Sequence, residues 1–214
     1  MLHRYTASCR GTDMIESIDP NEILTKYLTN SKRIAHSVST GLFMEQYADV
    51  AAVDPKTAYI AGTYHDLAKD LPLEEMVRLS RSMKERGIYT IDYFDYKVNN
   101  PSLLHGVAAS ELLYTEYGVD DKSILTAIAH HTTGGAGLDN LAKWTFLADF
   151  IEPLRDFHDA VKIRKVITKE HNFGKALGLA YTSLLQNLLD KHRNICPESL
   201  DGYNESIYQI MDNQ

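Results

Sequence analysis

The chain has 214 residues, of which 44% are hydrophobic and 24% charged, a composition that fits one globular domain of ordinary size. No run approaches 18 consecutive apolar residues, and the N-terminus lacks the basic-then-apolar order of a signal peptide, so we expect a cytoplasmic protein without a membrane span. The formal net charge of -7 argues against a nucleic-acid partner, because such proteins normally carry a basic face. Two cysteines without a CxxC spacing indicate neither a disulfide framework nor a thiolate zinc site.

The N-terminal segment differs from the rest of the chain. Residues 1–13 show no sustained hydrophobic period, and the first persuasive segment begins at Met14. We therefore expect residues 1–17 to form a flexible extension and residues 18–214 to form a single domain.

Apolar residues at helical spacing, together with capping residues, predict helices through the remainder of the chain. Pro20 follows Asp19 at the start of the first helix, and Asn30 caps the second. The expected helices cover residues 20–28, 31–47, 58–68, 73–84, 103–117, 123–131, 141–151, 159–170 and 173–191, with a polar helix after Pro197. A tyrosine-rich connection precedes Pro101. No strand alternation and no repeat is convincing, so the predicted fold class is all-α.

The dipeptide His65-Asp66 offers one nitrogen and one oxygen ligand, a set suited to a divalent first-row metal. Neighbours in a continuous helix point about 100° apart, so the two side chains converge only near a kink or a helix end. Lys69 would share the face of His65 and lie where an anionic substrate would sit. The alternative is a buried histidine, a surface aspartate and a solvated lysine, because the pair alone is a weak motif.

Other candidate ligands lie on separate predicted helices or at their ends: His36, His105, His131 and Asp149. Arg33 lies three residues before His36, so both side chains can reach one cleft. Asp149 interrupts an apolar run and needs a cation, which a metal or an ion pair with Arg155 or a lysine would supply. His130 and His131 end a helix, either as caps that the helix dipole stabilises or as part of a ligand-bearing loop. The glycines of residues 134–137 are a weak signal of a phosphate cradle.

The order His, His-Asp, Asp on facing helices resembles the HD-domain metal-dependent phosphohydrolases. Five segments narrow this resemblance to the YqeK-type symmetrical diadenosine tetraphosphatases of bacteria: residues 33–37, 61–69, 103–106, 127–134 and 147–155. The likeness covers roughly residues 18–197. The histidine-threonine-threonine-glycine block and the aspartate block with its Glu-Pro-x-Arg tail are far more specific than the His-Asp pair. The fold that the resemblance implies is an HD-domain helical bundle with a metal site between helices.

The resemblance also implies an activity, which is hydrolysis of diadenosine tetraphosphate at the central phosphoanhydride to give two ADP. One or two divalent ions, most often iron, with manganese, cobalt or zinc as alternatives, would be held by His36, His65, Asp66 and Asp149. The catalytic residues would be Asp66, Lys69, His105 and His131, the two histidines facing the phosphates or completing a second metal site. The implied substrate-binding residues are Arg33, His36, Asp66, Lys69, His105, His131, Thr132, Asp149, Arg155, Lys191, His192, Arg193, Asn194, Ile195 and Cys196.

Two alternatives stay open at this point: an HD phosphohydrolase acting on a mono-, tri- or cyclic nucleotide, and a non-catalytic nucleotide-binding domain. A second histidine, His130, directly precedes His131. We expect His131 to face the site, because it adjoins Thr132 as in the family motif. A homodimer is compatible with the sequence, although no heptad pattern demands it.

Overall fold

Short polar side chains start the helices where the sequence places them. In the computed structural model, which describes residues 14, 15 and 17–211, Asp19 accepts a hydrogen bond from the amide of Asn21 at the start of α2 (Pro20–Tyr27). Asn30 caps α3 (Ser31–Gln46) in the same way. The other side-chain caps are Asp54 on α4 (Pro55–Tyr64), Asp121 on α8 (Lys122–His130), Asp139 on α9 (Asn140–Ile151) and Asn172 on α11 (Phe173–Asp190). Each cap satisfies an amide that would otherwise have no partner within its helix.

The remaining elements are also helical. They are η1 (Ala48–Ala51), α5 (Leu73–Arg86), α6 (Phe94–Asn99), η2 (Pro101–Leu103), α7 (His105–Tyr117), α10 (His158–Lys165), the π-helical turn η3 (Val166–Glu170) and α12 (Pro197–Met211). No β-strand occurs in the part of the chain that the structure describes. The predicted all-α fold class is confirmed.

Three expectations differ from the structure or fall outside it. Helix α4 ends at Tyr64 instead of residue 68, and turns follow it. Helix α6 was not predicted, because a six-residue helix inside the tyrosine-rich connection is too short to show a hydrophobic period. Residues 1–13 and 16, most of the expected extension, lie outside the described residues, whereas Ile15 is buried in the core. The division into residues 1–17 and 18–214 stays a prediction.

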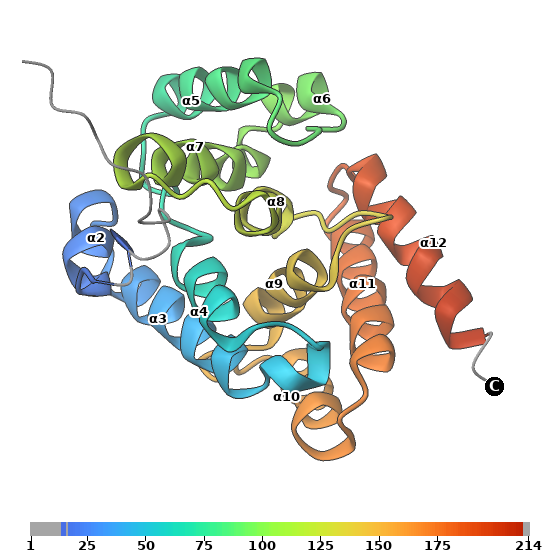
Figure 1. Cartoon of the computed structure of the whole chain (residues 1–214). Coiled ribbons are helices and arrows are strands. Elements are labelled where there is room, and N and C mark those ends of the chain that lie inside the picture. The colour runs from blue at the N-terminus through green and yellow to red at the C-terminus, as the bar shows by residue number, and fades with distance from the viewer. Residues whose placement is uncertain (1–13, 16, 212–214) are drawn as a thin grey trace, which may run out of the picture.

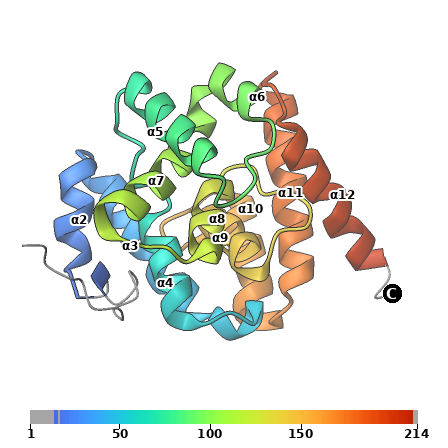
Figure 2. The same cartoon turned by 45° about the horizontal axis from the view of Figure 1, so that its top comes forward.

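Helices α3, α4, α8 and α9 surround the centre of the molecule, as Figure 1 shows. Helix α7 packs on α8 and carries α5 on its outer side, while the α11–α12 hairpin lies beyond α9; both arrangements recur in Figure 2. Among the described helices, none combines the length and the apolar character that a membrane span requires.

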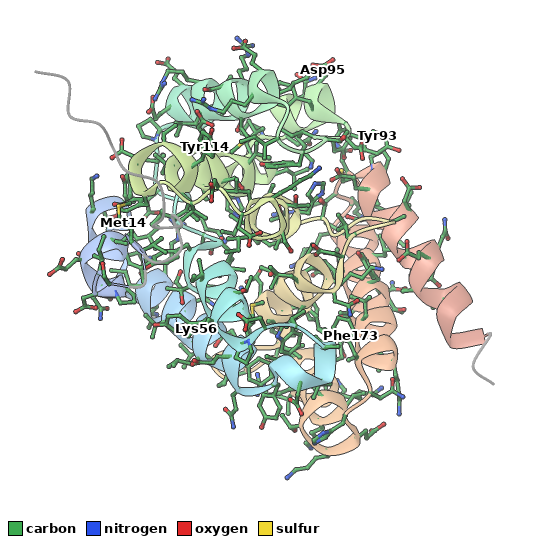
Figure 3. The ribbon with its side chains drawn as sticks, viewed as in Figure 1. Met14, Lys56, Tyr93, Asp95, Tyr114 and Phe173 are labelled. Atoms are coloured by element: carbon green, nitrogen blue, oxygen red, sulfur yellow. The ribbon has the colours of Figure 1, made fainter. Side chains whose placement is uncertain are left out.

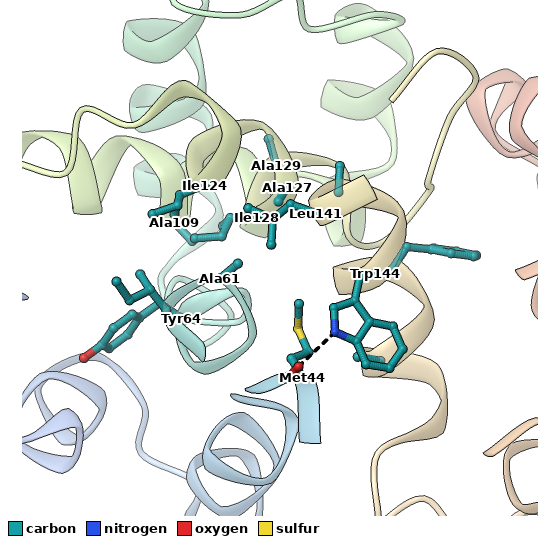
Figure 4. Close-up of a cluster of buried hydrophobic side chains, with 14 of the residues drawn as sticks. Met44, Ala61, Tyr64, Ala109, Ile124, Ala127, Ile128, Ala129, Leu141 and Trp144 are labelled. Atoms are coloured by element: carbon teal, nitrogen blue, oxygen red, sulfur yellow. Dashed lines mark hydrogen bonds between the residues drawn. The ribbon is translucent and has the colours of Figure 1, made fainter. Parts of the chain in front are cut away.

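Helices α3 and α9 are joined inside the core by a directional contact. The indole nitrogen of Trp144 donates a hydrogen bond of 3.1 Å to the carbonyl of Met44, and both side chains are fully buried. Figure 4 shows this bond among apolar side chains of α4 and α8, including Ala61 and Ile128. A buried indole N–H needs an acceptor, so the pairing fixes how α9 lies on α3.

Two close helix contacts bring histidines together. Where α3 crosses α4, a Cβ on Gly62 would lie 2.9 Å from the Cα of Gly41, so only glycine permits this approach. Where α7 crosses α8, a Cβ on Gly106 would lie 2.6 Å from the carbonyl oxygen of Ile128. The first contact pairs the helix of His36 with the helix that ends before His65. The second adjoins His105.

Candidate metal centre

The end of α4 solves the orientation problem of the His-Asp pair. Because the helix stops at Tyr64, His65 and Asp66 lie in the following turn, and their side chains converge with Nε2 and Oδ2 3.6 Å apart. Both residues are buried, with 0% and 1% of their surface exposed. The Nδ1 atom of His65 lies 2.7 Å from the carbonyl oxygen of Gly62, which orients the ring.

A first group of ligand atoms forms where α3, α4 and α9 meet. The Nε2 atom of His36 lies 3.2 Å from Nε2 of His65 and 2.9 Å from Oδ1 of Asp149. The same Asp149 oxygen lies 3.6 Å from Nε2 of His65, and Asp66 Oδ2 lies 3.9 Å from Nε2 of His36. The four residues that the resemblance implied as metal ligands therefore lie together, with their donor atoms directed at one another.

A second group shares Asp66 with the first. Its Oδ1 atom lies 3.0 Å from Nε2 of His105 and 3.3 Å from Nε2 of His131, and these two nitrogens are 3.0 Å apart. All three side chains are buried. The carboxylate of Asp66 thus has one oxygen toward each group.

The donor set fits divalent cations. Nδ1 of His65, His105 and His131 lies 2.7 to 2.8 Å from a backbone carbonyl oxygen, so these atoms carry the proton and Nε2 presents a lone pair. Unprotonated Nε2 atoms at 3.0 Å from each other repel unless a cation lies between them. Among the described residues, Oδ1 of Asp66 is buried without a hydrogen-bond partner. Imidazole and carboxylate together suit iron, manganese, cobalt or zinc.

The electrostatic environment keeps four of these candidate ligands in the protonation state that binds a metal. Burial lowers the pKa of His65 and of His105 below the ordinary value, so both rings are neutral. Burial opposes ionisation of Asp66, but the neighbouring histidines outweigh it and hold its pKa well below the usual range. At Asp149, burial likewise opposes ionisation, but the hydrogen bond with His36 outweighs it and holds the pKa of the carboxyl well below its usual range. Both aspartates are therefore carboxylates at neutral pH.

Two cations lie on the more exposed side of the cluster. Lys69 places Nζ 2.7 Å from Oδ2 of Asp66, and Arg155 places Nη2 2.7 Å from Oδ1 of Asp149. Arg155 Nη2 also lies 3.3 Å from Nε2 of His36. About a third of each cationic side chain is exposed, so both cations can also contact a bound anion. Arg33 behaves differently, because it pairs with Asp70 instead of reaching the cluster.

A cavity of about 380 Å³ adjoins the second group of ligands. Its wall includes Ser102, whose carbonyl orients His105, and Thr132, which directly follows His131. The other lining residues are Tyr96, Asn100, Leu103, Thr133, Leu184, Leu188, His192, Arg193, Asn194, Cys196 and Ser199. Four of the six residues expected at the nucleoside end, those at positions 192–194 and 196, thus lie on this wall.

Lys191 lines a different hollow, together with Phe150 and Phe157. Ile195 is half-buried and is not part of the wall of either hollow. The segment 191–196 is therefore divided between two surfaces, and only part of it faces the cavity beside the ligands.

The two adjacent histidines point in different directions. His131 faces Asp66, as expected, whereas Nδ1 of His130 lies 3.6 Å from Oε1 of Glu198. The glycine segment also faces away from the ligands: the amide of Gly135 donates a hydrogen bond to the hydroxyl of Tyr181 on α11. The structure therefore does not support the phosphate-cradle interpretation of residues 134–137.

Sequence reasoning missed Glu152 as a member of the site. Its Oε1 accepts a hydrogen bond from Nδ1 of His36, and its Oε2 accepts one from the hydroxyl of Ser39 and one from the amide of Leu154. The side chain is 1% exposed. The Glu-Pro-x-Arg tail pointed to this position, but no spacing rule connected it with a histidine 116 residues away.

Comparison with known proteins identifies the family of the chain. The model of the HD domain family matches residues 33–154, so the chain belongs to the HD-domain family. The symmetrical bis(5'-nucleosyl)-tetraphosphatase of Bacillus subtilis is 31% identical over 172 residues, which are 80% of this chain and 88% of that protein. The protein of the same name from Halalkalibacterium halodurans is 30% identical over 194 residues, 88% of this chain and 95% of that protein.

A solved structure shows the same fold. A predicted HD superfamily hydrolase involved in NAD metabolism, from Clostridium acetobutylicum, aligns with a TM-score of 0.78 and 30% identity over 89% of this chain and 96% of that one. Within the HD-domain family, the chain belongs with the symmetrical bis(5'-nucleosyl)-tetraphosphatases. The resemblance and the HD-domain helical bundle that it implied are confirmed.

Proposed function

We propose that the protein hydrolyses diadenosine tetraphosphate, and related dinucleoside polyphosphates, symmetrically to two nucleoside diphosphates. The observation that carries the proposal is Asp66, a buried carboxylate shared by two groups of histidines beside a cavity that residues 192–194 help to line. The names of the relatives with about 30% identity over most of the chain support this substrate. The same names favour diadenosine tetraphosphate over another nucleotide as the substrate, and an enzyme over a non-catalytic binding domain.

The cofactor is one or two divalent ions, and we propose iron as the native metal, with manganese, cobalt or zinc as alternatives. His36, His65, Asp66 and Asp149 would hold the first ion, and Asp66, His105 and His131 would hold the second. Ions bound there would supply Lewis-acid stabilisation of the phosphate oxygens and would lower the pKa of a water molecule that attacks phosphorus. The donor set supports this assignment, because imidazole and carboxylate are ligands common to all four metals.

The chain's own residues position the phosphates and balance their charge. Lys69 and Arg155 lie on the more exposed side of the cluster, where they can contact the oxygens of a polyphosphate. Asp66 is a carboxylate with an oxygen toward each histidine group, so it can orient or deprotonate the attacking water. Phosphoryl transfer requires mainly such positioning and charge stabilisation.

The adjoining cavity supports the proposed position of cleavage. Thr132, His192 and Arg193 line it, so we place one nucleoside end there, with its phosphates leading to the ligand cluster. Symmetrical cleavage follows when the second phosphorus from this nucleoside lies at the cluster. Arg193 and the two exposed cations would then contact successive phosphates.

The test is a product assay on protein loaded anaerobically with iron or with manganese. Diadenosine tetraphosphate should give ADP as the sole nucleotide product when the mixture is resolved by chromatography. AMP together with ATP would contradict symmetrical cleavage while leaving an HD hydrolase. A parallel panel of nucleoside mono- and triphosphates and cyclic nucleotides identifies another substrate if it is turned over faster.

We also propose that the enzyme acts in the cytoplasm on a small-molecule substrate and without a nucleic-acid partner. The net charge of -7 supports the absence of a nucleic-acid footprint. Homodimer formation stays a prediction that sedimentation of the purified protein can test.

A further inference from the structure

A buried ion pair links α6 to α12 behind the cavity. The Nζ atom of Lys97 lies 2.7 Å from Oε2 of Glu198, and the two residues are 1% and 3% exposed. In Figures 1 and 2, α6 lies beside the end of the α11–α12 hairpin. Figure 3 shows Tyr93 in the same region, where its hydroxyl donates a hydrogen bond to Asp201. Two contacts therefore hold the unpredicted helix against α12.

Glu198 also holds the loop that follows the metal-facing histidine. The hydroxyl of Thr133 donates a hydrogen bond of 2.7 Å to Oε2 of Glu198, the oxygen that Lys97 contacts. The hydroxyl of Ser199 donates one of 2.9 Å to the carbonyl of Thr133. Two consecutive residues of α12 therefore contact Thr133, one at its side-chain hydroxyl and the other at its backbone carbonyl.

The neighbours of these residues form the wall of the cavity. Tyr96 precedes Lys97, Thr132 precedes Thr133, and Ser199 follows Glu198; each of these neighbours is a lining residue. Three segments that are distant in the sequence thus meet at one carboxylate, and the same three segments form part of the wall of the cavity assigned to a nucleoside. Glu198 therefore contacts both α6, through Lys97, and the loop that follows His131, through Thr133.

Stability alone does not explain a buried charge pair. Two charges removed from water lose their hydration, and an apolar pair of the same volume is often equally stable. What an apolar pair lacks is the directional acceptor for the hydroxyl of Thr133. The ion pair therefore fixes the direction of the Thr133 hydroxyl, which apolar packing alone does not do.

We propose that Glu198, held by Lys97, is a positioning residue for the nucleoside cavity. By anchoring Thr133 it fixes the backbone of Thr132 and the separation of α6 from α12. Glu198 touches neither the metal ligands nor the reacting phosphates, so it acts on substrate binding. The inference rests on the proposed function, because it assigns the cavity to the nucleoside end of the substrate.

Two double variants distinguish a positioning role of Glu198 from a purely stabilising one. Both replace Lys97 and Glu198 together, so neither leaves one charge of the pair buried without the other. Lys97→Met with Glu198→Gln removes both charges but retains an oxygen acceptor for Thr133. Lys97→Met with Glu198→Leu removes both charges and the acceptor. We expect the leucine variant to raise KM for diadenosine tetraphosphate at least tenfold, with kcat within about threefold of the native value and unchanged metal content. The glutamine variant should restore KM to within about threefold.

Thr133→Val removes the same hydrogen bond from its other side and should raise KM to a similar extent. Melting temperatures of all variants are measured in parallel, because a purely stabilising role would lower the melting temperature and leave KM unchanged. Equal KM values for the glutamine and leucine variants, with the native enzyme active, would overturn the inference.

The affinity for ADP, measured by calorimetry on the same proteins, reports on the cavity without turnover. If the native enzyme does not cleave diadenosine tetraphosphate, the proposed function fails, and the ADP affinities of the two double variants still decide the inference. An ADP affinity that is equal in the two variants, or absent from the native protein, overturns it.

Discussion

Glu152 accepts a hydrogen bond of 3.0 Å from Nδ1 of His36 and thereby directs the Nε2 atom of that ring at Asp149. Carboxylate partners of this kind fix the tautomer and the orientation of a metal-binding histidine. Burial lowers the pKa of His36, but the hydrogen bonds to Asp149 and Glu152 outweigh it and raise the pKa to about 9, so a metal ion bound at Nε2 would displace a proton from that atom. The pair is therefore part of the metal centre, although Glu152 itself is no candidate ligand.

Replacing Glu152 by glutamine should weaken metal binding by roughly 10- to 100-fold, because the ring of His36 loses its charged partner. Competition with a chromogenic chelator measures the affinity. Glu45→Gln is the matched control, since Glu45 lies exposed on α3, the helix that carries His36. If the two variants bound manganese equally well, the role assigned to Glu152 would be wrong.

The contact between α3 and α4 predicts a strong effect of a single methyl group. Gly62→Ala should destabilise the protein by about 1–3 kcal/mol, because the added Cβ overlaps with Gly41 and with the sulfur of Met44. Urea unfolding of the metal-free protein measures this change. Gly174→Ala is the control: a Cβ there meets open space, and alanine in a helix should stabilise by about 0.5–1 kcal/mol. A neutral Gly62→Ala would contradict the close contact.

The two arginines that the resemblance assigned to phosphate binding should differ in importance. Arg155 contacts Asp149 and lies beside the cluster, so Arg155→Ala should lower kcat/KM by about 10²- to 10³-fold, the usual cost of a lost charge-stabilising donor. Arg33 is paired with Asp70, and Arg33→Ala should lower kcat/KM less than tenfold. Steady-state kinetics with diadenosine tetraphosphate decides the order. A larger loss for Arg33 would show that this side chain leaves Asp70 when substrate binds.

Removal of the metal should lower the thermal stability without unfolding the protein. Binding to the folded state contributes about 2.7 kcal/mol when the free metal is at 100 times its Kd. Chelation should therefore lower the melting temperature by several degrees, while the far-ultraviolet circular dichroism stays helical because the apolar core contains no metal ligand. Asp66→Asn should abolish most of this dependence, since Asp66 serves both groups. An unchanged dependence in that variant would exclude a shared ligand.

Most helix starts followed from local patterns, whereas the set of four metal ligands came from the family resemblance. Asp19 and Asn30 lie at the starts of the two helices where the sequence placed them, because capping depends on residues within one turn. The early end of α4 was the condition for His65 and Asp66 to converge, and the structure meets it.

What the sequence did not reveal depends on tertiary contacts. Helical spacing put Arg33 on the face of His36, but Asp70, from the turn after α4, pairs with it. The Lys97–Glu198 pair joins residues that no periodicity relates, and the helix of Lys97 is stabilised by that contact more than by its own six residues. The direction of His130 also depends on Glu198.

The bond between Trp144 and Met44 gives the protein an internal optical probe. The chain contains one tryptophan, and its indole is fully buried between α3, which carries His36, and α9, which carries Asp149. Separation of these helices exposes the indole to water and shifts its fluorescence to longer wavelength. The intrinsic emission of the unlabelled protein therefore follows the assembly of the two helices on which the first metal site depends.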